Sequence, residues 1–355
     1  MCSWLAGLSL VAGFGGAATP AIAPPIPVPF RRLSPIAALL GGLALAQPAL
    51  AEPSIRDLPA RIELRAIDTL TLSDQQFLTG DKNGRPATIG GMLKIPQRVT
   101  GRVPAVIIQH ASGGLSGRDE FWGRMFNEMG IAAFAVDSFS GRGLTSTSDN
   151  QAGLGRLNMV LDAYRAYDIL ASHPRIDPSR IAVMGFSRGG QSTLYASLRR
   201  FQNMWNPKAA FALFIPLYAS CNTTFIDDTD VSAPIRQYHG AADDYVPVAP
   251  CRLYFERLRA AGRDAQLIEY PNAYHVYDNP LASRTTTVAK GAQTVRACTL
   301  KEQTPGVIVN ATTGEPFTYK DPCIQTNPHV GYNEAAATAT YKAVSDLLRA
   351  TFKLE

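Results

Sequence analysis

Residues 185–189 read Gly-Phe-Ser-Arg-Gly, so a serine stands between two glycines, each two positions away. The run before it, 180–184, is short, apolar and rich in β-branched residues, and the run after it, 191–201, has good helix formers and no proline. A G-x-S-x-G pattern recurs by chance, but between a buried strand and a helix it predicts a tight turn with Ser187 exposed at its tip. Glycines are needed there because a Cβ would collide with neighbouring backbone. The pattern therefore predicts nucleophilic attack by the serine hydroxyl.

A serine hydroxyl is a weak nucleophile at neutral pH, so the pattern predicts a histidine base and an acid that orients it. The chain has five histidines, His110, His173, His239, His275 and His329. The chain order serine, acid, histidine that accompanies this turn excludes the two before Ser187. His275 follows a predicted strand and a Pro-Asn turn, which is where such a fold presents its base. His239 is followed at once by glycine, which favours a buried turn residue, and no strand precedes His329.

The acid is expected in the loop 239–247, which contains the neighbouring pair Asp243 and Asp244. Either carboxylate could stay ionised while partly buried, accept the imidazole N–H and fix its tautomer. The other aspartate would then be a charge at a helix N-terminus or facing solvent. The intervals from Ser187 to this loop and from the loop to His275 each leave room for a helix and a strand.

These motifs together resemble the dienelactone hydrolase family of the α/β-hydrolase superfamily. The segments that carry the resemblance are 185–190, 240–243, 246–247 and 270–275, within a similarity that covers roughly 85–280 and the last helix. In the family's pattern the first aspartate is the acid, which implies Asp243. The best-known members have a cysteine nucleophile where this chain has Ser187, and compact members lack the segment that follows His275 here. The resemblance implies an α/β-hydrolase fold and a serine-nucleophile variant of the family.

Two backbone N–H donors should stabilise the oxyanion that forms on attack. One is the N–H of Arg188, which follows the nucleophile and starts a helix, where it has no intrahelical partner. The other should come from the loop 110–114 after the buried strand 104–109, which resembles a His-Gly-x-Gly loop. The N–H of Ser112 is the predicted donor, with Ala111 as the alternative. The Arg188 side chain could reach a carboxylate or stay in solvent.

The elements that must position these residues alternate along the chain. Two antiparallel strands are expected at the start of the domain, at 61–66 and 87–95, with a turn at 81–84. Further strands are predicted at 103–109, 131–136, 180–186, 210–217, 234–239 and 265–270, and helices at 119–128, 157–172, 190–201, 249–261 and 333–352. This βα alternation predicts a mostly parallel central sheet with helices on both faces. The segment 281–330 is irregular and too long for a simple connection, so it is expected to be a flap at the site mouth or a remote surface decoration.

The N-terminal region predicts export. Arg31 and Arg32 precede a short apolar stretch and an Ala-x-Ala end, which describes a signal peptide cleaved after Ala51. We therefore interpret 1–51 as a signal region, with a true start nearer Val28, and 52–355 as one α/β-hydrolase domain. The apolar run is too short and too often interrupted by glycine and proline to span a membrane. A periplasmic or secreted protein is expected.

Four cysteines follow the predicted cleavage site, Cys221, Cys251, Cys298 and Cys323. An even number in an oxidising compartment predicts disulfides, and four cysteines allow three pairings. We favour Cys298–Cys323, which would pin the segment 281–330, together with Cys221–Cys251. No Cys-x-x-Cys pair and no His/Cys spacing indicates a metal site.

The charge is +5 and includes no basic run, which gives no support to a nucleic-acid partner. The sequence thus predicts a serine hydrolase that cleaves a small ester or lactone through Ser187, His275 and Asp243, without a cofactor. A peptidase or an acyltransferase of the same fold would use the same three residues. A non-catalytic binding protein on this scaffold is a further alternative.

Overall fold

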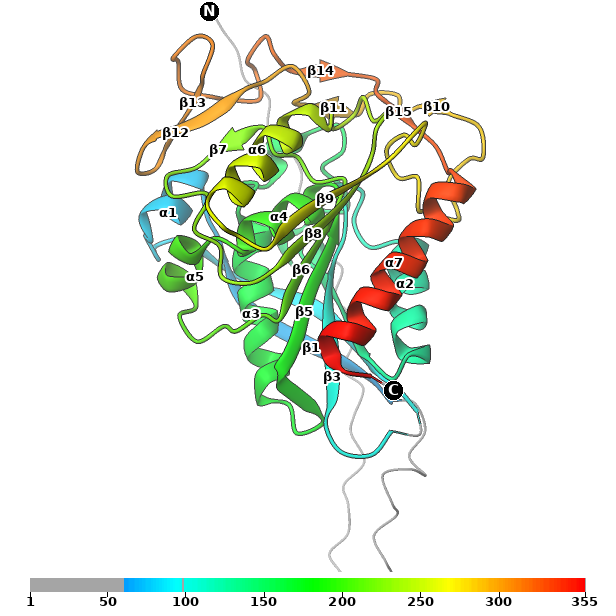
Figure 1. Cartoon of the computed structure of the whole chain (residues 1–355). Helices are drawn as coiled ribbons and strands as arrows, with labels where there is room; N and C mark the ends of the chain where they lie inside the picture. The colour runs from blue at the N-terminus through cyan, green and yellow to red at the C-terminus, as the bar shows by residue number, and fades with distance from the viewer. Residues whose placement is uncertain (1–60, 98, 355) are drawn as a thin grey trace, which may run out of the picture. The chain divides into compact units, whose positions relative to one another are not determined.

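The computed structural model describes residues 61–97 and 99–354 (Figure 1). The predicted signal region 1–51, with its cleavage site, lies outside these residues. An eight-stranded sheet has the strand order β1-β2-β4-β3-β5-β6-β8-β9. Its strands are β1 (Arg61–Thr71), β2 (Arg85–Ile95), β3 (Val103–Gln109), β4 (Ala132–Asp137), β5 (Ile176–Phe186), β6 (Leu213–Leu217), β8 (Ile235–Gly240) and β9 (Ala265–Tyr270). Strand β2 is antiparallel to both of its neighbours, and all other pairs are parallel. The predicted mostly parallel α/β fold is confirmed.

Helices cover both faces of the sheet (Figure 1). They are α1 (Asp74–Thr79), α2 (Gly117–Glu128), α3 (Asn158–Ser172), α4 (Arg188–Ala196), α5 (Arg199–Trp205), α6 (Ala249–Ala260) and α7 (Glu334–Phe352). The central strand β3 shows why helices pack on both faces of the sheet. Its residue Ile107 belongs to one apolar cluster and the next residue, Ile108, belongs to the other. Side chains of a strand alternate between faces, so a strand buried on both sides is apolar throughout.

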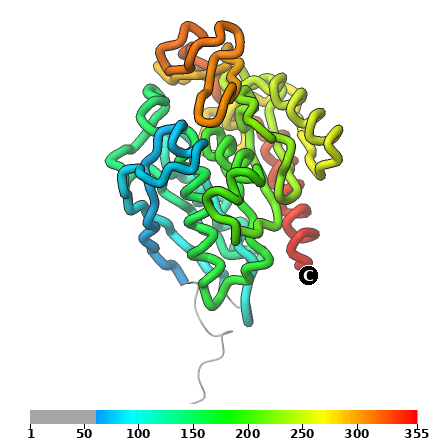
Figure 2. Tube along the Cα trace, turned by 90° about the vertical axis from the view of Figure 1, so that its left-hand side faces the viewer, coloured from blue at the N-terminus to red at the C-terminus, as the bar shows by residue number. Residues whose placement is uncertain are grey.

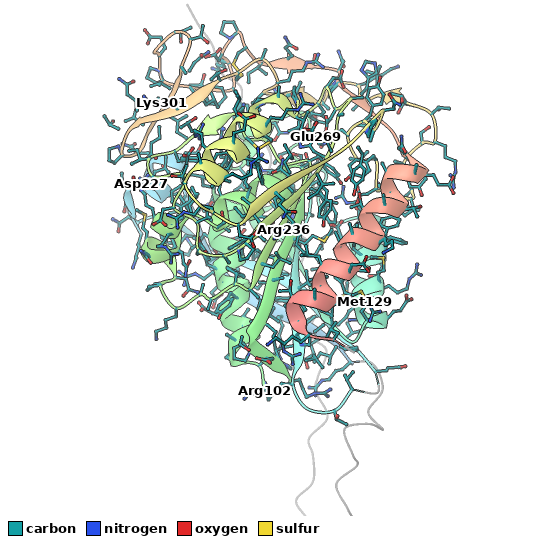
Figure 3. The ribbon with its side chains drawn as sticks, in the orientation of Figure 1. Arg102, Met129, Asp227, Arg236, Glu269 and Lys301 are labelled. Carbon is teal, nitrogen blue, oxygen red and sulfur yellow. A yellow bond between two sulfur atoms is a disulfide. The ribbon has the colours of Figure 1, made fainter. Side chains whose placement is uncertain are left out.

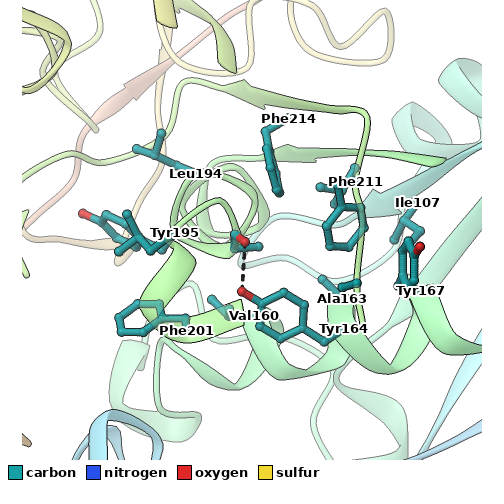
Figure 4. Packing of buried hydrophobic residues seen from close by; sticks show 14 of the residues in the cluster. Ile107, Val160, Ala163, Tyr164, Tyr167, Leu194, Tyr195, Phe201, Phe211 and Phe214 are labelled. Carbon is teal, nitrogen blue, oxygen red and sulfur yellow. Dashed lines mark hydrogen bonds between the residues drawn. The ribbon is translucent and has the colours of Figure 1, made fainter. Parts of the chain in front are cut away.

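The two apolar clusters use different helices. Helices α3, α4, α5 and α6 contribute to the first cluster, and α2 and α7 contribute to the second. Figure 4 shows part of the first, where the ring centroid of Tyr164 of α3 lies 6.2 Å from that of Phe211 and the Tyr164 hydroxyl donates to the backbone oxygen of Ala196 at 2.9 Å. This hydrogen bond joins α3 to the end of α4, and both helices also pack on the sheet. Within the described residues no helix has the length and apolarity needed to cross a bilayer.

The predicted helix 190–201 is wrong in its extent, because the structure has two helices there. Helix α4 already begins at Arg188, and the chain leaves the helical conformation at Leu198, whose φ and ψ are −67° and 121°. Leu198 forms a β-bridge to Val231, and Ser232 N–H donates to the oxygen of Ser197. A distant segment therefore supplies the interaction that interrupts the helix. Strand β6 is also shorter than predicted, since it begins at Leu213 rather than at 210.

We call residues 281–330 the insert, and it lies beyond the carboxyl ends of the parallel strands (Figures 1 and 2). In Figure 3, Lys301 of the insert and Arg102, which precedes β3, mark opposite ends of the molecule. The insert was predicted to be irregular but contains short strands that pair. They are β10 (Thr287–Val288), β11 (Gln293–Thr294), β12 (Leu300–Thr304), β13 (Val307–Asn310), β14 (Gln325–Thr326) and β15 (His329–Val330), and β12 also pairs with β7 (Thr223–Thr224). Strands of two residues show no alternation that a sequence pattern could reveal.

Two disulfides are present, and they are the pair of connections favoured from the sequence. Cys298–Cys323 lies within the insert, and Cys221–Cys251 joins the segment after β6 to helix α6. Cys298 and Cys251 are both buried. The insert is therefore covalently closed around its β12–β13 hairpin.

Candidate active site

The turn between β5 and α4 places Ser187 in a conformation that non-glycine residues seldom adopt. Its φ is 53° and its ψ is −110°. The Ser187 N–H donates to the oxygen of Leu217 at 3.0 Å, and its own oxygen accepts from Gln191 N–H at 2.7 Å. These bonds hold the strained backbone in place, and strain that the surroundings maintain in this way is typical of functional sites.

The glycines on either side of Ser187 are required by close backbone contacts. A Cβ built on Gly185 would lie 2.2 Å from the oxygen of Gly189, and one built on Gly189 would lie 2.3 Å from the oxygen of Gln109. Backbone atoms cannot move away from such a contact as a flexible side chain could. The sharp turn therefore depends on these two residues, as the sequence predicts.

Substitution of Gly185 by alanine is expected to lower the free energy of unfolding by about 3 kcal/mol or more, because the methyl group would enter occupied space. Urea titration followed by circular dichroism measures this loss. Gly90→Ala is the matched control, since a Cβ at that strand position meets nothing within 4 Å. Equal stability of the two variants would contradict the steric explanation of the turn.

The three residues predicted to do chemistry lie together at the carboxyl edge of the sheet. His275 Nε2 is 2.9 Å from Ser187 Oγ, and His275 Nδ1 is 2.7 Å from Asp243 Oδ2. The other oxygen of Asp243 accepts the N–H groups of Tyr245 and Val246 at 2.9 and 2.8 Å. These two backbone donors fix the orientation of the carboxylate, so that Oδ2 faces the imidazole. The acid that contacts the imidazole is thus the first aspartate of the pair.

The His275 ring is held between two aromatic side chains that the sequence interpretation did not identify. The ring centroids of Tyr218 and Tyr245 lie 4.7 and 4.6 Å from that of His275. The Tyr218 hydroxyl donates to buried Asp278 at 2.7 Å, which fixes the tyrosine ring in turn. Tyr245 directly follows the aspartate pair, so its position in the loop was the one available signal. Both contacts restrict rotation of the imidazole.

Two other histidines near the site are structural, in agreement with the sequence interpretation. His239 is fully buried, with Nε2 donating to the oxygen of Val246 at 2.8 Å and Nδ1 facing the Gln237 amide at 3.0 Å. Burial lowers the pKa of His239, although the neighbouring Asp243 acts in the opposite direction. His110 accepts the N–H of Ser138 at Nε2, and burial lowers its pKa as well. Neither ring is hydrogen-bonded to the serine.

The two predicted oxyanion donors lie on elements that meet at Ser187. Arg188 is the first residue of α4, and Ser112 belongs to the loop after β3 that also lines the cavity at the serine. Within residues 61–97 and 99–354 neither backbone N–H donates a hydrogen bond. Both groups are therefore free to bind a negative oxygen. The alternative donor, Ala111, lines a second, larger cavity that Ser112 also lines.

The Arg188 side chain departs from both expectations, since it reaches neither a carboxylate nor solvent. It is buried and donates to the oxygens of Gln151 and Leu154. These partners belong to the segment between β4 and α3. The arginine connects this segment to the nucleophile turn, a contact between distant parts of the chain that sequence spacing does not reveal.

Asp244 also departs from its expected role, because it anchors the insert. Its carboxylate accepts the backbone N–H of His329 at 2.8 Å, contacts the ring nitrogen Nδ1 of His329 at 2.8 Å, and accepts from Arg296 at 3.1 Å. Although burial acts in the opposite direction, the His329 hydrogen bonds lower the pKa of Asp244. Val330, the last residue of the insert, forms a β-bridge to His275, and the N–H of the following Gly331 donates to the oxygen of His275 at 3.1 Å. The insert therefore contacts the loops that carry both Asp243 and His275, which supports its interpretation as a flap at the site mouth.

Loss of the Cys298–Cys323 disulfide is expected to loosen the insert locally, because closing a loop of this length stabilises it by about 3 kcal/mol. In the double variant Cys298→Ser, Cys323→Ser, amide hydrogen exchange across 281–330 should become faster, while amides of β3 and β5 should be unchanged. Faster exchange throughout the sheet would instead show that the disulfide supports the whole fold.

Two cavities meet at Ser187. The larger, of about 460 Å³, is lined by His275, by Arg118 and by insert residues that include Lys290 and Val330. The smaller, of about 50 Å³, has a more polar lining than the larger one and includes Arg188 but not His275. The described residues contain no group of three or more histidine, cysteine or carboxylate side chains suited to hold a metal ion.

Comparison with solved structures shows similarity to dienelactone hydrolases. The chain is similar to a dienelactone hydrolase-like promiscuous phosphotriesterase from metagenomic libraries, with a TM-score of 0.53, 17% identity, and coverage of 82% of this chain and 99% of that one. It is also similar to a putative dienelactone hydrolase from Klebsiella pneumoniae, with a TM-score of 0.52, 16% identity, and coverage of 81% and 98%. At these identities the likeness concerns the fold.

Curated relatives extend the comparison to sequence. A putative carboxymethylenebutenolidase of Methylorubrum extorquens is 27% identical over 241 residues, covering 60% of this chain and 79% of the relative. A protein of the same description from Yersinia pestis is 28% identical over 204 residues, covering 52% and 72%. The model of the dienelactone hydrolase family matches residues 89–352, which include Ser187, Asp243 and His275. The chain therefore belongs to the dienelactone hydrolase family.

Proposed function

We propose that this protein hydrolyses carboxylic esters or lactones through an acyl-enzyme formed on Ser187. The observation that carries the proposal is the hydrogen-bonded series Ser187–His275–Asp243, which starts at a serine held in a strained turn. Membership of a hydrolase family supports the reaction class. The arrangement matches a nucleophile, a general base and an orienting acid.

The proposed reaction assigns one role to each of these residues. Neutral His275 takes the proton of the Ser187 hydroxyl as its oxygen attacks the carbonyl carbon, and Asp243 stabilises the resulting imidazolium. The N–H groups of Arg188 and Ser112 bind the developing oxyanion. When the tetrahedral intermediate collapses, His275 donates its proton to the departing alkoxide. Water, activated by the same imidazole, then releases the acid and restores the serine.

The description shared by the two curated relatives makes butenolide lactones one substrate class to test, beside open esters. A panel of p-nitrophenyl esters, lactones and peptide amides should be assayed with wild type and Ser187→Ala. We expect Ser187-dependent hydrolysis of short acyl esters or lactones, and little cleavage of amides. Preferential cleavage of the amides would favour a peptidase, and preferential transfer of the acyl group to an added alcohol would favour an acyltransferase. A folded wild-type protein that turns over no member of the panel would favour the non-catalytic binding protein.

We also propose that the chain is exported and cleaved after Ala51, leaving residues 52–355. Two disulfides support this, because such bonds persist in oxidising compartments. Expression in a Gram-negative host, followed by mass spectrometry of the periplasmic fraction, should give a protein that begins at Glu52. Retention of the full chain in the cytoplasm would contradict the proposal.

A further inference from the structure

The smaller cavity beside Ser187, which we call the polar pocket, contains positive charge without a matching acid. Its lining residues include Gln151, Gln191 and Gln293, with Arg156 and Arg188 beside them. Among the described residues that line it, none is an aspartate or a glutamate. The amides, hydroxyls and guanidinium groups in this lining can hydrogen-bond a polar ligand, which an apolar acyl chain would leave without partners.

Both arginines are buried, with 3% of Arg156 and 6% of Arg188 exposed. Arg188 has no carboxylate within 4 Å among the described residues. Arg156 has Asp74 at 3.5 Å from Nε, too long for a hydrogen bond, and Nη1 donates to the Thr223 hydroxyl at 3.1 Å. Phe317 packs against the Arg156 guanidinium at 5.0 Å, which fixes its plane. Among the described residues, Asp74 is thus the one carboxylate within 4 Å of either guanidinium group, and it is partly exposed.

Several nitrogens of these arginines lack any partner. Nε and Nη2 of Arg156 and Nε of Arg188 are buried and make no hydrogen bond within the part of the chain that the structure describes. Burying a cation without a counter-charge is costly, and an unpaired donor adds to that cost. Burial and the neighbouring charge of Arg156 both lower the pKa of Arg188. An anion in the polar pocket would supply the missing counter-charge to both guanidinium groups.

The position of His275 indicates which part of an ester enters the polar pocket. The imidazole must reach the oxygen of the leaving alcohol to protonate it. His275 lines the larger cavity and not the polar pocket, whereas Ser187 and Ser112 line both. The alcohol part should therefore occupy the larger cavity, and the acyl part should extend into the polar pocket.

We propose that the preferred substrate carries a carboxylate on its acyl part, bound in the polar pocket by Arg156 and Arg188. Such a substrate is a monoester of a short dicarboxylic acid, and its hydrolysis releases the dicarboxylate and an alcohol. The inference rests on the proposed esterase function and adds the substrate class. A pocket of about 50 Å³ suits a carboxylate with a short methylene chain.

Three esters test the inference with the wild-type protein. Monoethyl glutarate has the carboxylate on the acyl side, its isomer β-(butanoyloxy)propanoate has it on the alcohol side, and ethyl pentanoate is neutral. Initial rates of proton release should give a kcat/KM for monoethyl glutarate at least about tenfold above both others, because hydrogen bonds to charged groups have that effect on affinity. Equal values, or a preference for either of the other esters, overturn the inference. Hydrolysis of the neutral ester without that preference would leave the proposed esterase function intact.

Substitution of Arg156 tests which side chain confers the preference. In Arg156→Gln the ratio of kcat/KM for monoethyl glutarate to that for ethyl pentanoate should fall by about tenfold, and Arg156→Lys should restore part of it. A purely structural arginine would change both esters in proportion and leave the ratio as it is, which overturns the assignment.

Binding can also be measured without turnover. Calorimetric titration of Ser187→Ala with monoethyl glutarate should show saturable binding that weakens about tenfold or more when Arg156→Gln is added. Unchanged affinity in the double variant would remove Arg156 from the site even if the esterase assay were to fail for other reasons.

Discussion

Replacement of Ser187 by alanine is expected to lower kcat/KM for a short acyl ester by about 10⁴-fold or more. Alanine removes the oxygen that lies 2.9 Å from His275 Nε2 and leaves the two oxyanion donors in place. Any remaining rate would come from water attacking a carbonyl that these donors still polarise. Spectrophotometric assay of a p-nitrophenyl ester with both proteins measures the loss.

The control for this variant is Ser192→Ala. Ser192 lies on the same helix α4, is buried, and its hydroxyl has no hydrogen-bond partner among the described residues. Its removal should change kcat/KM less than about threefold, because a hydroxyl that makes no hydrogen bond contributes little to the stability of the helix. Similar losses in both variants would indicate damage to the helix rather than removal of a nucleophile.

Substitution of Asp243 by asparagine is also expected to lower kcat/KM by about 10⁴-fold, because it would favour the wrong tautomer of the His275 imidazole. The Tyr245 and Val246 N–H groups would hold the amide oxygen where Oδ1 now lies, so the amide NH₂ would face His275 Nδ1. Nδ1 would have to accept, Nε2 would carry the proton, and the histidine could no longer accept from Ser187. Folding should be retained, because the substitution preserves shape.

The adjacent residue provides the matched control. Asp244→Asn has the same chemical change one position away, but Asp244 binds His329 and Arg296 of the insert rather than His275. Its expected effect is a modest decrease, within about tenfold, caused by looser attachment of the insert to the site. If Asp244→Asn were the more damaging of the two, the assignment of the acid would be wrong.

The residues around Ser187 could be predicted from sequence because each rests on a local rule. A tight turn requires glycine at fixed distances, and the carboxyl ends of parallel strands bring the loops after β5, β8 and β9 to one edge. The alternation of apolar strands with amphipathic helices likewise revealed most of the sheet. Helix α1 was missed although Ser73 and Gln76 form a capping box, a signal that is present in the sequence.

What could not be predicted depends on contacts between distant segments. The helix break at Leu198 arises from a bridge to Val231, and the role of Asp244 arises from His329, eighty-five residues further along the chain. Neither partner has a spacing rule that would identify it beforehand. Most strands of the insert have only two residues, too few to show an alternation in the sequence, and β12 pairs with the distant β7. The charge in the polar pocket likewise appears only once Arg156 and Arg188 are folded together.

Covalent labelling of the nucleophile tests the proposed chemistry most directly. Wild-type protein treated with a fluorophosphonate should gain one adduct, which peptide mass spectrometry should locate on Ser187, with simultaneous loss of esterase activity. Ser187→Ala should remain unlabelled, and Asp243→Asn should label far more slowly than Asp244→Asn. A folded, active protein that stays unmodified at Ser187, or loses its activity through an adduct elsewhere, would contradict the proposed mechanism.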